Sequence, residues 1–199
     1  MLKIRQLQKK KQEEAAAAAE SAASISLTES TNLNTSANLS SSRVSAAQLR
    51  LQKDITEIDL PRSIKLTFPD PSDLFNFNLS ITPQEGYYKG GTFEFKTEIN
   101  NNFPIEPPKI KCLNKIYHPN IDLDGNICLN ILREDWSPVL NLNSILIGLN
   151  FLFLEPNPND PLNKDAANVL VKNKSVFTSN VKSSMRGGYI DNEHYDRVV

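Results

Sequence analysis

The chain has 199 residues, of which 39% are hydrophobic and 23% charged, so it carries enough apolar material for one sizeable core. Its net charge of −1 gives no general attraction to nucleic acid or to anionic membranes, and neither is an expected partner. The two cysteines, Cys112 and Cys128, are too few for the disulfide framework of a small secreted domain. We therefore expect a reduced intracellular protein.

The first 43 residues differ in composition from the rest. Residues 1–14 are basic and glutamine-rich, and three apolar residues are spaced as on one side of a helix: Met1, Ile4 and Leu7. Residues 15–43 are mostly Ala, Ser, Thr and Asn and cannot bury enough apolar surface to offset their ordering entropy. We predict an N-terminal docking peptide, a flexible linker and a folded catalytic domain over residues 44–199. A mitochondrial transit peptide is a rival interpretation of the start, and its glutamates count against it.

The folded part begins with a predicted helix. Ser45 is its expected N-cap, Gln48 three positions later completes a capping-box pattern, and Pro61 ends it. Apolar and polar residues then alternate as in strands over four segments: 64–68, 75–81, 93–99 and 109–113. The turn-rich connections between them suit antiparallel hairpins rather than βαβ crossovers.

Helices return in the last third of the chain. The apolar stretch from Leu142 to Leu154 is too short for a membrane span and predicts a buried core helix. Asn143 is its predicted N-cap, so that the helix runs from Ser144. Two further helices are predicted near residues 164–171 and 175–185. This order predicts an α+β fold, with a four-stranded antiparallel sheet, an N-terminal helix and C-terminal helices.

The chemistry is expected in the long irregular segment 114–141, because loops of that length in compact domains are usually functional or disordered. It holds His118, Asn120, Cys128 and Trp136, with a predicted tight turn at residues 124–126 just before Cys128. Cys112, in contrast, lies in an alternating strand, and we interpret it as a buried hydrophobe.

Two other uses of the cysteines are disfavoured. A metal site would combine them with His118 and His194, whose separations match no common metal-site spacing, so no metal is expected. A cysteine protease needs a histidine base. The only downstream candidate is His194, which lies in a polar C-terminal tail that we predict to be loosely held.

Four motifs, in chain order, resemble those of the ubiquitin-conjugating enzymes: residues 104–108, His118-Pro119-Asn120 with Cys128 eight positions after Asn120, residues 135–138, and residues 155–163. Three segments are similar to the fungal form of the branch that conjugates the Rub/Nedd-type ubiquitin-like modifier: residues 128–136, 185–189 and 1–7. The resemblance implies the ubiquitin-conjugating (UBC) fold. It also implies an enzyme that accepts the modifier as a thioester on Cys128 and passes it to a lysine of a target.

The resemblance assigns roles around Cys128. Asn120 would stabilise the oxyanion on the thioester carbonyl or brace its own loop, and both roles stay open. Asp160 would orient the acceptor lysine, with an N-cap or turn residue before Pro161 as the alternative. His118 and Pro119 are expected to be structural. A thiol with an ordinary pKa of about 8.5 is mostly protonated at neutral pH, but exchange between two similar thioesters tolerates modest activation.

Partner surfaces are implied in the same way. The two loops on which RING-type ligases dock are matched by Ile105, Ser137, Pro138 and Val139, although these residues could instead pack on each other. Arg50 and Lys53 match the helix face that meets a heterodimeric activating enzyme, although such charges are commonly only solvated. The N-terminal peptide would bind the activating enzyme, and its acetylated Met1 a cullin co-ligase. The alternative is a plain solubilising tail.

The implied target is a cullin, in the cytoplasm and nucleus. No cofactor is expected, because ATP is consumed by the upstream activating enzyme. Two alternatives remain: a conjugating enzyme for ubiquitin itself, and a catalytically silent member that only binds. The presence of Cys128 with Asn120 and Asp160 argues against the silent member, and the N-terminal peptide distinguishes the two active ones.

Overall fold

The computed structural model describes residues 44–199, so the predictions for the N-terminal peptide and the linker, including Met1, Ile4 and Leu7, lie outside the described residues. Four strands form one antiparallel sheet in the order β1-β2-β3-β4. Their bounds are Ile64–Thr67 (β1), Asn76–Ile81 (β2), Phe93–Glu98 (β3) and Lys109–Cys112 (β4). The predicted α+β class and the four antiparallel strands are confirmed, and each strand is within two residues of its predicted bounds.

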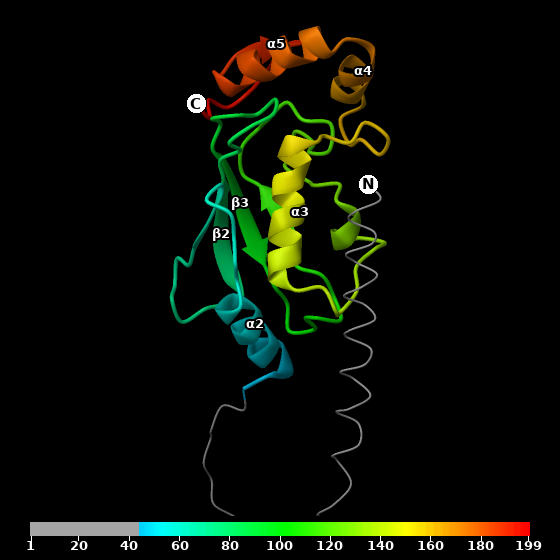
Figure 1. The fold of residues 1–199 in the computed structure, drawn as a ribbon. Helices are drawn as coiled ribbons and strands as arrows, with labels where there is room; N and C mark the ends of the chain where they lie inside the picture. Colours follow the sequence, from blue (N-terminus) through cyan, green and yellow to red (C-terminus); the bar gives the residue numbers. More distant parts are fainter. Residues whose placement is uncertain (1–43) are drawn as a thin grey trace, which may run out of the picture. The chain divides into compact units, whose positions relative to one another are not determined.

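The core lies between one face of this sheet and helix α3, Leu142–Leu154 (Figure 1). In β2 and β3 every second residue is buried, and the register places Leu79 opposite Phe95 and Ile81 opposite Phe93. The ring of Phe153 from α3 stacks on Phe93 at 4.5 Å. The most apolar stretch of the chain is thus a core helix, as predicted. Within residues 44–199, no helix has the length and apolar character that crossing a membrane would need.

Helix α2, Ala46–Thr56, begins at the predicted cap. Ser45 Oγ accepts a hydrogen bond from the backbone N–H of Gln48 at 3.0 Å, which satisfies one of the free donors of the first turn. The helix ends at Thr56, however, well before Pro61: Glu57 makes the last i→i−4 bond, to the carbonyl of Lys53 at 3.0 Å, and the N–H of Ile58 turns to the carbonyl of Ile55 at 3.4 Å. The proline follows the end of the helix rather than causing it.

The predicted N-cap of α3 is wrong by two residues. Asn141, not Asn143, caps the helix, and its Oδ1 accepts from the N–H of Ser144 at 3.0 Å. The helix starts earlier because Asp54 of α2 accepts a hydrogen bond from the N–H of Leu142 at 3.1 Å. The side chain of Asn143 is used elsewhere, accepting from the N–H of Asp59 at 3.2 Å.

Helices α4 (Lys164–Lys172) and α5 (Lys174–Met185) confirm the last two helix predictions, and they lie at the opposite end of the sheet from α2 (Figure 1). The tail after them is not loosely held, contrary to the prediction. Two short strands pair as a hairpin, β5 (Tyr189–Ile190) and β6 (Glu193–His194). Tyr195 is buried, and Asp196 exchanges hydrogen bonds with the backbone of Lys115 at 2.8 and 3.0 Å. This tail is fastened by long-range contacts that its polar sequence does not reveal.

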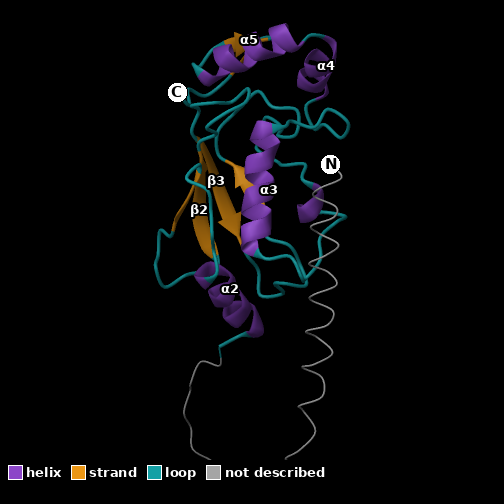
Figure 2. Cartoon of the chain, in the orientation of Figure 1, coloured by secondary structure: helices purple, strands orange, loops and turns teal. Residues whose placement is uncertain are grey.

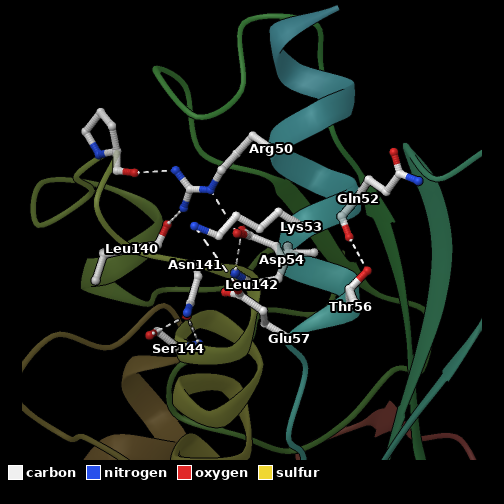
Figure 3. Close-up of polar contacts among 11 residues, drawn as sticks. Arg50, Gln52, Lys53, Asp54, Thr56, Glu57, Leu140, Asn141, Leu142 and Ser144 are labelled. Carbon is white, nitrogen blue, oxygen red and sulfur yellow. Dashed lines mark hydrogen bonds and ion pairs between the residues drawn. The ribbon is translucent and has the colours of Figure 1, made fainter. Parts of the chain in front are cut away.

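A clamp centred on Arg50 joins α2 to the loop before α3 (Figure 3). Its Nε donates to Asp54 at 2.8 Å, and its two Nη atoms donate to the carbonyls of Pro138 and Leu140 at 2.7 Å each. Asp54 is only 4% exposed, and its second oxygen holds the N–H of Leu142. The alternative that Arg50 merely lies on a solvated helix face is therefore wrong: its donors hold the backbone of a loop.

We predict that Asp54→Ala lowers the free energy of unfolding by about 2 kcal/mol, because it strips a buried charged partner from Arg50 and from the N–H of Leu142. Urea unfolding measures this loss. Glu57→Ala is the matched control on the same helix: its exposed carboxylate pairs with Lys53 only at 4.0 Å, so the expected change is within about 0.5 kcal/mol. Equal losses in the two variants would contradict the clamp.

Candidate active site

Cys128 is positioned by a loop that folds back on itself between β4 and α3. Most of this segment has no regular secondary structure (Figure 2), but its backbone is bonded at several points. The N–H of Cys128 donates to the carbonyl of Asn120 at 2.8 Å, and isolated bridges join Ile121 to His118 and to Ile127. The cysteine and the asparagine, eight positions apart in sequence, are therefore neighbours in space.

The predicted tight turn before Cys128 is present and is pressed against strand β4. The side chain of Asp122 accepts from the N–H groups of Asp124 and Asn126 at 3.0 and 2.8 Å. Gly125 has φ +81°, and a Cβ there would meet the carbonyl oxygen of Cys112 at 2.0 Å. Only glycine fits this position, which ties the loop to the sheet.

His118 is structural, as predicted. It is fully buried, its Nδ1 accepts from the N–H of Asn120 at 2.9 Å, and its Nε2 lies 3.0 Å from the carbonyl of Leu152, to which it must donate. Burial lowers the pKa of His118 to about 4, so the ring is neutral at physiological pH. With both nitrogens occupied, His118 is not available as a base for the thiol. The neighbouring Pro119 carbonyl accepts from the N–H groups of Leu162 and Asn163 at 2.9 Å each.

The side-chain amide of Asn120 joins two loops. Nδ2 donates to the carbonyls of Asn157 and Asp160 at 2.8 and 3.1 Å, while Oδ1 accepts from the N–H of Asn157 at 2.8 Å. The residue is 1% exposed. Both amide hydrogens are thus used within the protein, which is the bracing role; the oxyanion role stays a prediction.

Asp160 and an arginine that the sequence did not single out both reach the cysteine sulfur. Cys128 Sγ donates to Asp160 Oδ2 at 2.9 Å, and Arg133 Nη1 donates to Sγ at 3.0 Å. Asp160 is not a helix cap, because Asn163 caps α4. Arg133 follows the short 3₁₀ helix η1, Asn130–Leu132, which no periodicity in the sequence predicts. Its only sequence signal is a cation five positions after the cysteine.

The electrostatics do not pre-activate the thiol. Burial raises the pKa of Cys128, the adjacent Asp160 carboxylate raises it further, and Arg133 acts in the opposite direction. For the other cysteine, burial raises the pKa to about 12, which fits the inert core thiol predicted for Cys112. The geometry gives Cys128 a fixed place, an acid and a cation, rather than a base.

The predicted partner loops present apolar surface. Ile105 is 76% exposed and Val139 57%, and Pro138 is also exposed. Trp136 fastens the two loops together, since its indole N–H lies 3.1 Å from the carbonyls of both Pro104 and Ile105. The loops touch through this indole and leave Ile105 free to contact a partner.

Two further predicted partner residues, Lys53 and Ser137, make fewer or longer polar contacts than Arg50. The charge of Lys53 is exposed, with Glu57 at 4.0 Å as its ion pair. Ser137 is half-buried in the loop held by Arg50. Among residues 44–199, no group of three or more His, Cys, Asp or Glu side chains is arranged to hold a metal ion.

Comparison with known proteins identifies the family. Residues 50–185 match the sequence family described as ubiquitin-conjugating enzyme. The chain is a ubiquitin-conjugating enzyme. The four motifs that suggested this all fall in the matched region, and so does the Cys128 site. The predicted UBC fold is confirmed, as is the class of transferase that works through a thioester.

Individual relatives are similar to this chain beyond the region matched by the family, in one case over its whole length. It is 60% identical over 154 residues to the Nedd8-conjugating enzyme UbcE2M of Drosophila melanogaster, covering 77% of this chain and 85% of that protein. It is 46% identical to the NEDD8-conjugating enzyme UBC12 of Eremothecium gossypii, covering 100% of this chain and 99% of that protein. A solved structure of Saccharomyces cerevisiae Ubc12 is similar at a TM-score of 0.74, with 47% identity and 98% of both chains covered.

The buried histidine should give this ubiquitin-conjugating enzyme a measurable acid sensitivity. In the unfolded chain His118 takes up a proton near pH 6.5, whereas in the folded protein it stays neutral down to about pH 4. Stability is therefore lost as pH falls through this window, because the unfolded state binds more protons there. Between about pH 7 and pH 4.5, wild type should lose roughly 2–3 kcal/mol more than His118→Gln in urea unfolding. Equal losses of unfolding free energy in wild type and His118→Gln would show that His118 is not a neutral buried ring.

Proposed function

We propose that this enzyme conjugates NEDD8, taking it from the NEDD8-activating enzyme as a thioester on Cys128 and passing it to a lysine of a target protein. The proposal is carried by the similarity to relatives from fly, fungi, slime mould and plant, which are named NEDD8-conjugating enzymes and are 46–60% identical to this chain. The same names disfavour the ubiquitin alternative. The complete Cys128 site disfavours a silent member that only binds.

The first half-reaction needs access to Cys128 more than activation of it. The thiolate attacks the thioester carbonyl held by the activating enzyme, a new carbon–sulfur bond forms, and the old cysteine leaves as a thiolate. Reactant and product are both thioesters, so the exchange is close to balanced in free energy. A thiol whose pKa is raised still reacts through its small thiolate fraction.

The second half-reaction is aminolysis, and Asp160 is placed for it. Its carboxylate is exposed and lies beside Cys128 Sγ, where an incoming lysine amine must approach. A carboxylate there orients the ammonium group and takes up a proton as the amine attacks. Asn120 serves this step by holding the Asp160 backbone in place, and it would stabilise the oxyanion if one of its two bonds to carbonyls were exchanged.

The proposal extends to a ligase, a target and a co-ligase. The exposed apolar residues Ile105, Pro138 and Val139 suit docking of a RING-type ligase, which would bring a cullin as the target. The N-terminal peptide would bind the activating enzyme and, through acetylated Met1, a co-ligase. ATP is used upstream, so the enzyme itself works without a cofactor, in the cytoplasm and nucleus.

Loading assays test the central proposal. With ATP and the matched activating enzyme, the wild-type enzyme should gain the mass of NEDD8 in an adduct that a reducing thiol removes. Cys128→Ser should form no thiol-labile adduct, because an ester to serine oxygen resists thiols. Cys112→Ala, at the inert buried thiol, should load like wild type. Ubiquitin with its own activating enzyme should load at least tenfold more slowly; equal loading would refute NEDD8 selectivity.

The N-terminal docking hypothesis has its own test. Deleting residues 1–14 should slow NEDD8 loading at least tenfold when the conjugating enzyme is limiting, since a tenfold effect needs only about 1.4 kcal/mol and burying two or three apolar side chains contributes more than that to binding. The double variant Ile4→Asp with Leu7→Asp should reproduce the deletion. The matched control, Lys9→Gln with Lys10→Gln, removes charge but no apolar anchor and should stay near wild type. If the deletion left the loading rate unchanged, the docking hypothesis would be wrong and residues 1–14 would be a plain solubilising tail.

A further inference from the structure

Cys128 is almost covered, although a thioester carrier must expose its sulfur. The residue is 4% exposed, and the ends of two side chains from different segments contact Sγ. Asp160 comes from the loop before α4, and Arg133 follows η1. These two side chains are themselves about half exposed, at 54% and 53%. The sulfur is thus screened by groups that can move aside, not by the core.

The backbone of Arg133 is held by hydrogen bonds, whereas its guanidinium has few partners among the described residues. Its N–H donates to the carbonyl of Asn130 at 2.9 Å, and its carbonyl accepts from the N–H of Trp136 at 3.1 Å. Within residues 44–199, the guanidinium meets, beyond the sulfur, only long ion-pair contacts, to Glu134 at 3.7 Å and to Asp160 at 4.0 Å. Its short contact is therefore the one to Cys128 Sγ.

We propose that Arg133 is a further catalytic residue, whose guanidinium stabilises the Cys128 thiolate during loading and not during discharge. The proposal rests on the function proposed above. A guanidinium stays charged at all physiological pH values, and a charge-assisted hydrogen bond favours the anionic form of its acceptor. Arg133 thus offsets two opposing influences on the same sulfur, which are burial and the Asp160 carboxylate.

The step balances without any further group. The thiol proton leaves Sγ for solvent, with Asp160 Oδ2 as its nearest acceptor, and the anion stays paired with Arg133. The thiolate then attacks the thioester carbonyl and expels the activating enzyme's cysteine as a thiolate, which takes a proton from solvent. One carbon–sulfur bond forms and one breaks, and no oxidant or reductant is needed.

Loading changes what Arg133 can do. A thioester sulfur has no proton to donate to Asp160 and no negative charge to attract Arg133. Both contacts that cover Sγ are therefore lost or weakened. Arg133 is then left 4.0 Å from Asp160, where it pairs with the carboxylate that an acceptor lysine needs. In aminolysis Cys128 leaves as a thiolate, but a thiolate is expelled from the tetrahedral intermediate more readily than an amine, so attack by the amine limits the rate. The guanidinium should therefore assist loading and give little help to aminolysis, an asymmetry that a merely structural residue would not produce.

The pH profile of thiol alkylation tests the charge effect without any partner protein. Iodoacetamide reacts with Cys128 as a thiolate, whereas Cys112 is buried with a pKa of about 12 and stays silent. Arg133→Gln keeps a polar side chain but removes the charge. It should slow alkylation about two- to fivefold near neutral pH, the size of an exposed ion pair, and leave the high-pH plateau unchanged.

Two matched variants sharpen this test. Arg133→Lys keeps the charge and should recover most of the neutral-pH rate. Arg62→Gln makes the same substitution at an exposed arginine whose side chain has no hydrogen bond or ion pair within residues 44–199, and it should match wild type. If Arg133→Gln matches wild type at every pH, or Arg133→Lys is as slow as Arg133→Gln, the proposal is overturned.

Single-turnover kinetics test the asymmetry. Loading of Arg133→Gln by the activating enzyme should be about two- to fivefold slower near neutral pH and should recover as pH rises. Discharge of the preloaded variant to free lysine should be as fast as wild type or faster. Equal slowing of both steps would mark Arg133 as structural and overturn the proposal. Failure of the wild-type enzyme to load NEDD8 would instead overturn the proposed function, with the alkylation result for Arg133 unaffected.

Discussion

The site depends on one buried amide. Asn120, in the loop that carries Cys128, bonds through its side chain to the backbone of Asn157 and Asp160 in the other loop, with three hydrogen bonds in all. The amide itself is buried, so its donors and acceptor would lose their partners at a cost if these bonds were broken. The distance between nucleophile and acid is set by this amide together with the Pro119 carbonyl, which bonds to Leu162 and Asn163. His118 in turn orients the amide through the N–H of Asn120.

The same bonding explains why the thiol needs no base. Gly125 presses the loop against the carbonyl of Cys112, and the N–H of Cys128 is held by Asn120, so the sulfur is placed before any partner arrives. Placement reduces the entropic cost of reaction, and thioester exchange demands little more than a thiolate fraction. A strongly activated thiol would also be a good leaving group, which would shorten the life of a carrier. A raised pKa therefore suits a residue that must hold its cargo.

The sequence predicted regular elements well and tertiary bonds poorly. Strands β1–β4 and helices α3–α5 follow from periodicities of two and 3.6, which are local properties. The cap of α3 was wrong because Asn141 and Asn143 are both able to cap, and a contact with Asp54, far away in sequence, chooses between them. The segment after the C-terminal hairpin is held at long range, where Asp196 bonds to Lys115 and the N–H of Val198 to the carbonyl of Met185. Cys128, Asn120 and Asp160 were found only because motifs linked them. Arg133 lies in the segment 128–136 that indicated the branch, but nothing in the sequence pointed to its contact with the sulfur, and its role was missed.

The Arg50 clamp changes how the two predicted docking surfaces relate. The helix face predicted for the activating enzyme and the loop predicted for a ligase were separate in the sequence, yet Arg50 donates from one directly to the backbone of the other. Its guanidinium also lies over the ring of Phe103, at 5.5 Å, next to Trp136, which fastens the second loop. A protein that bound Arg50 would have to compete with these contacts, whereas Lys53 has an exposed charge and only a long contact to Glu57. Under the proposed docking on α2, Lys53 would therefore be the better recognition residue, and Arg50 would act by shaping the surface beside it.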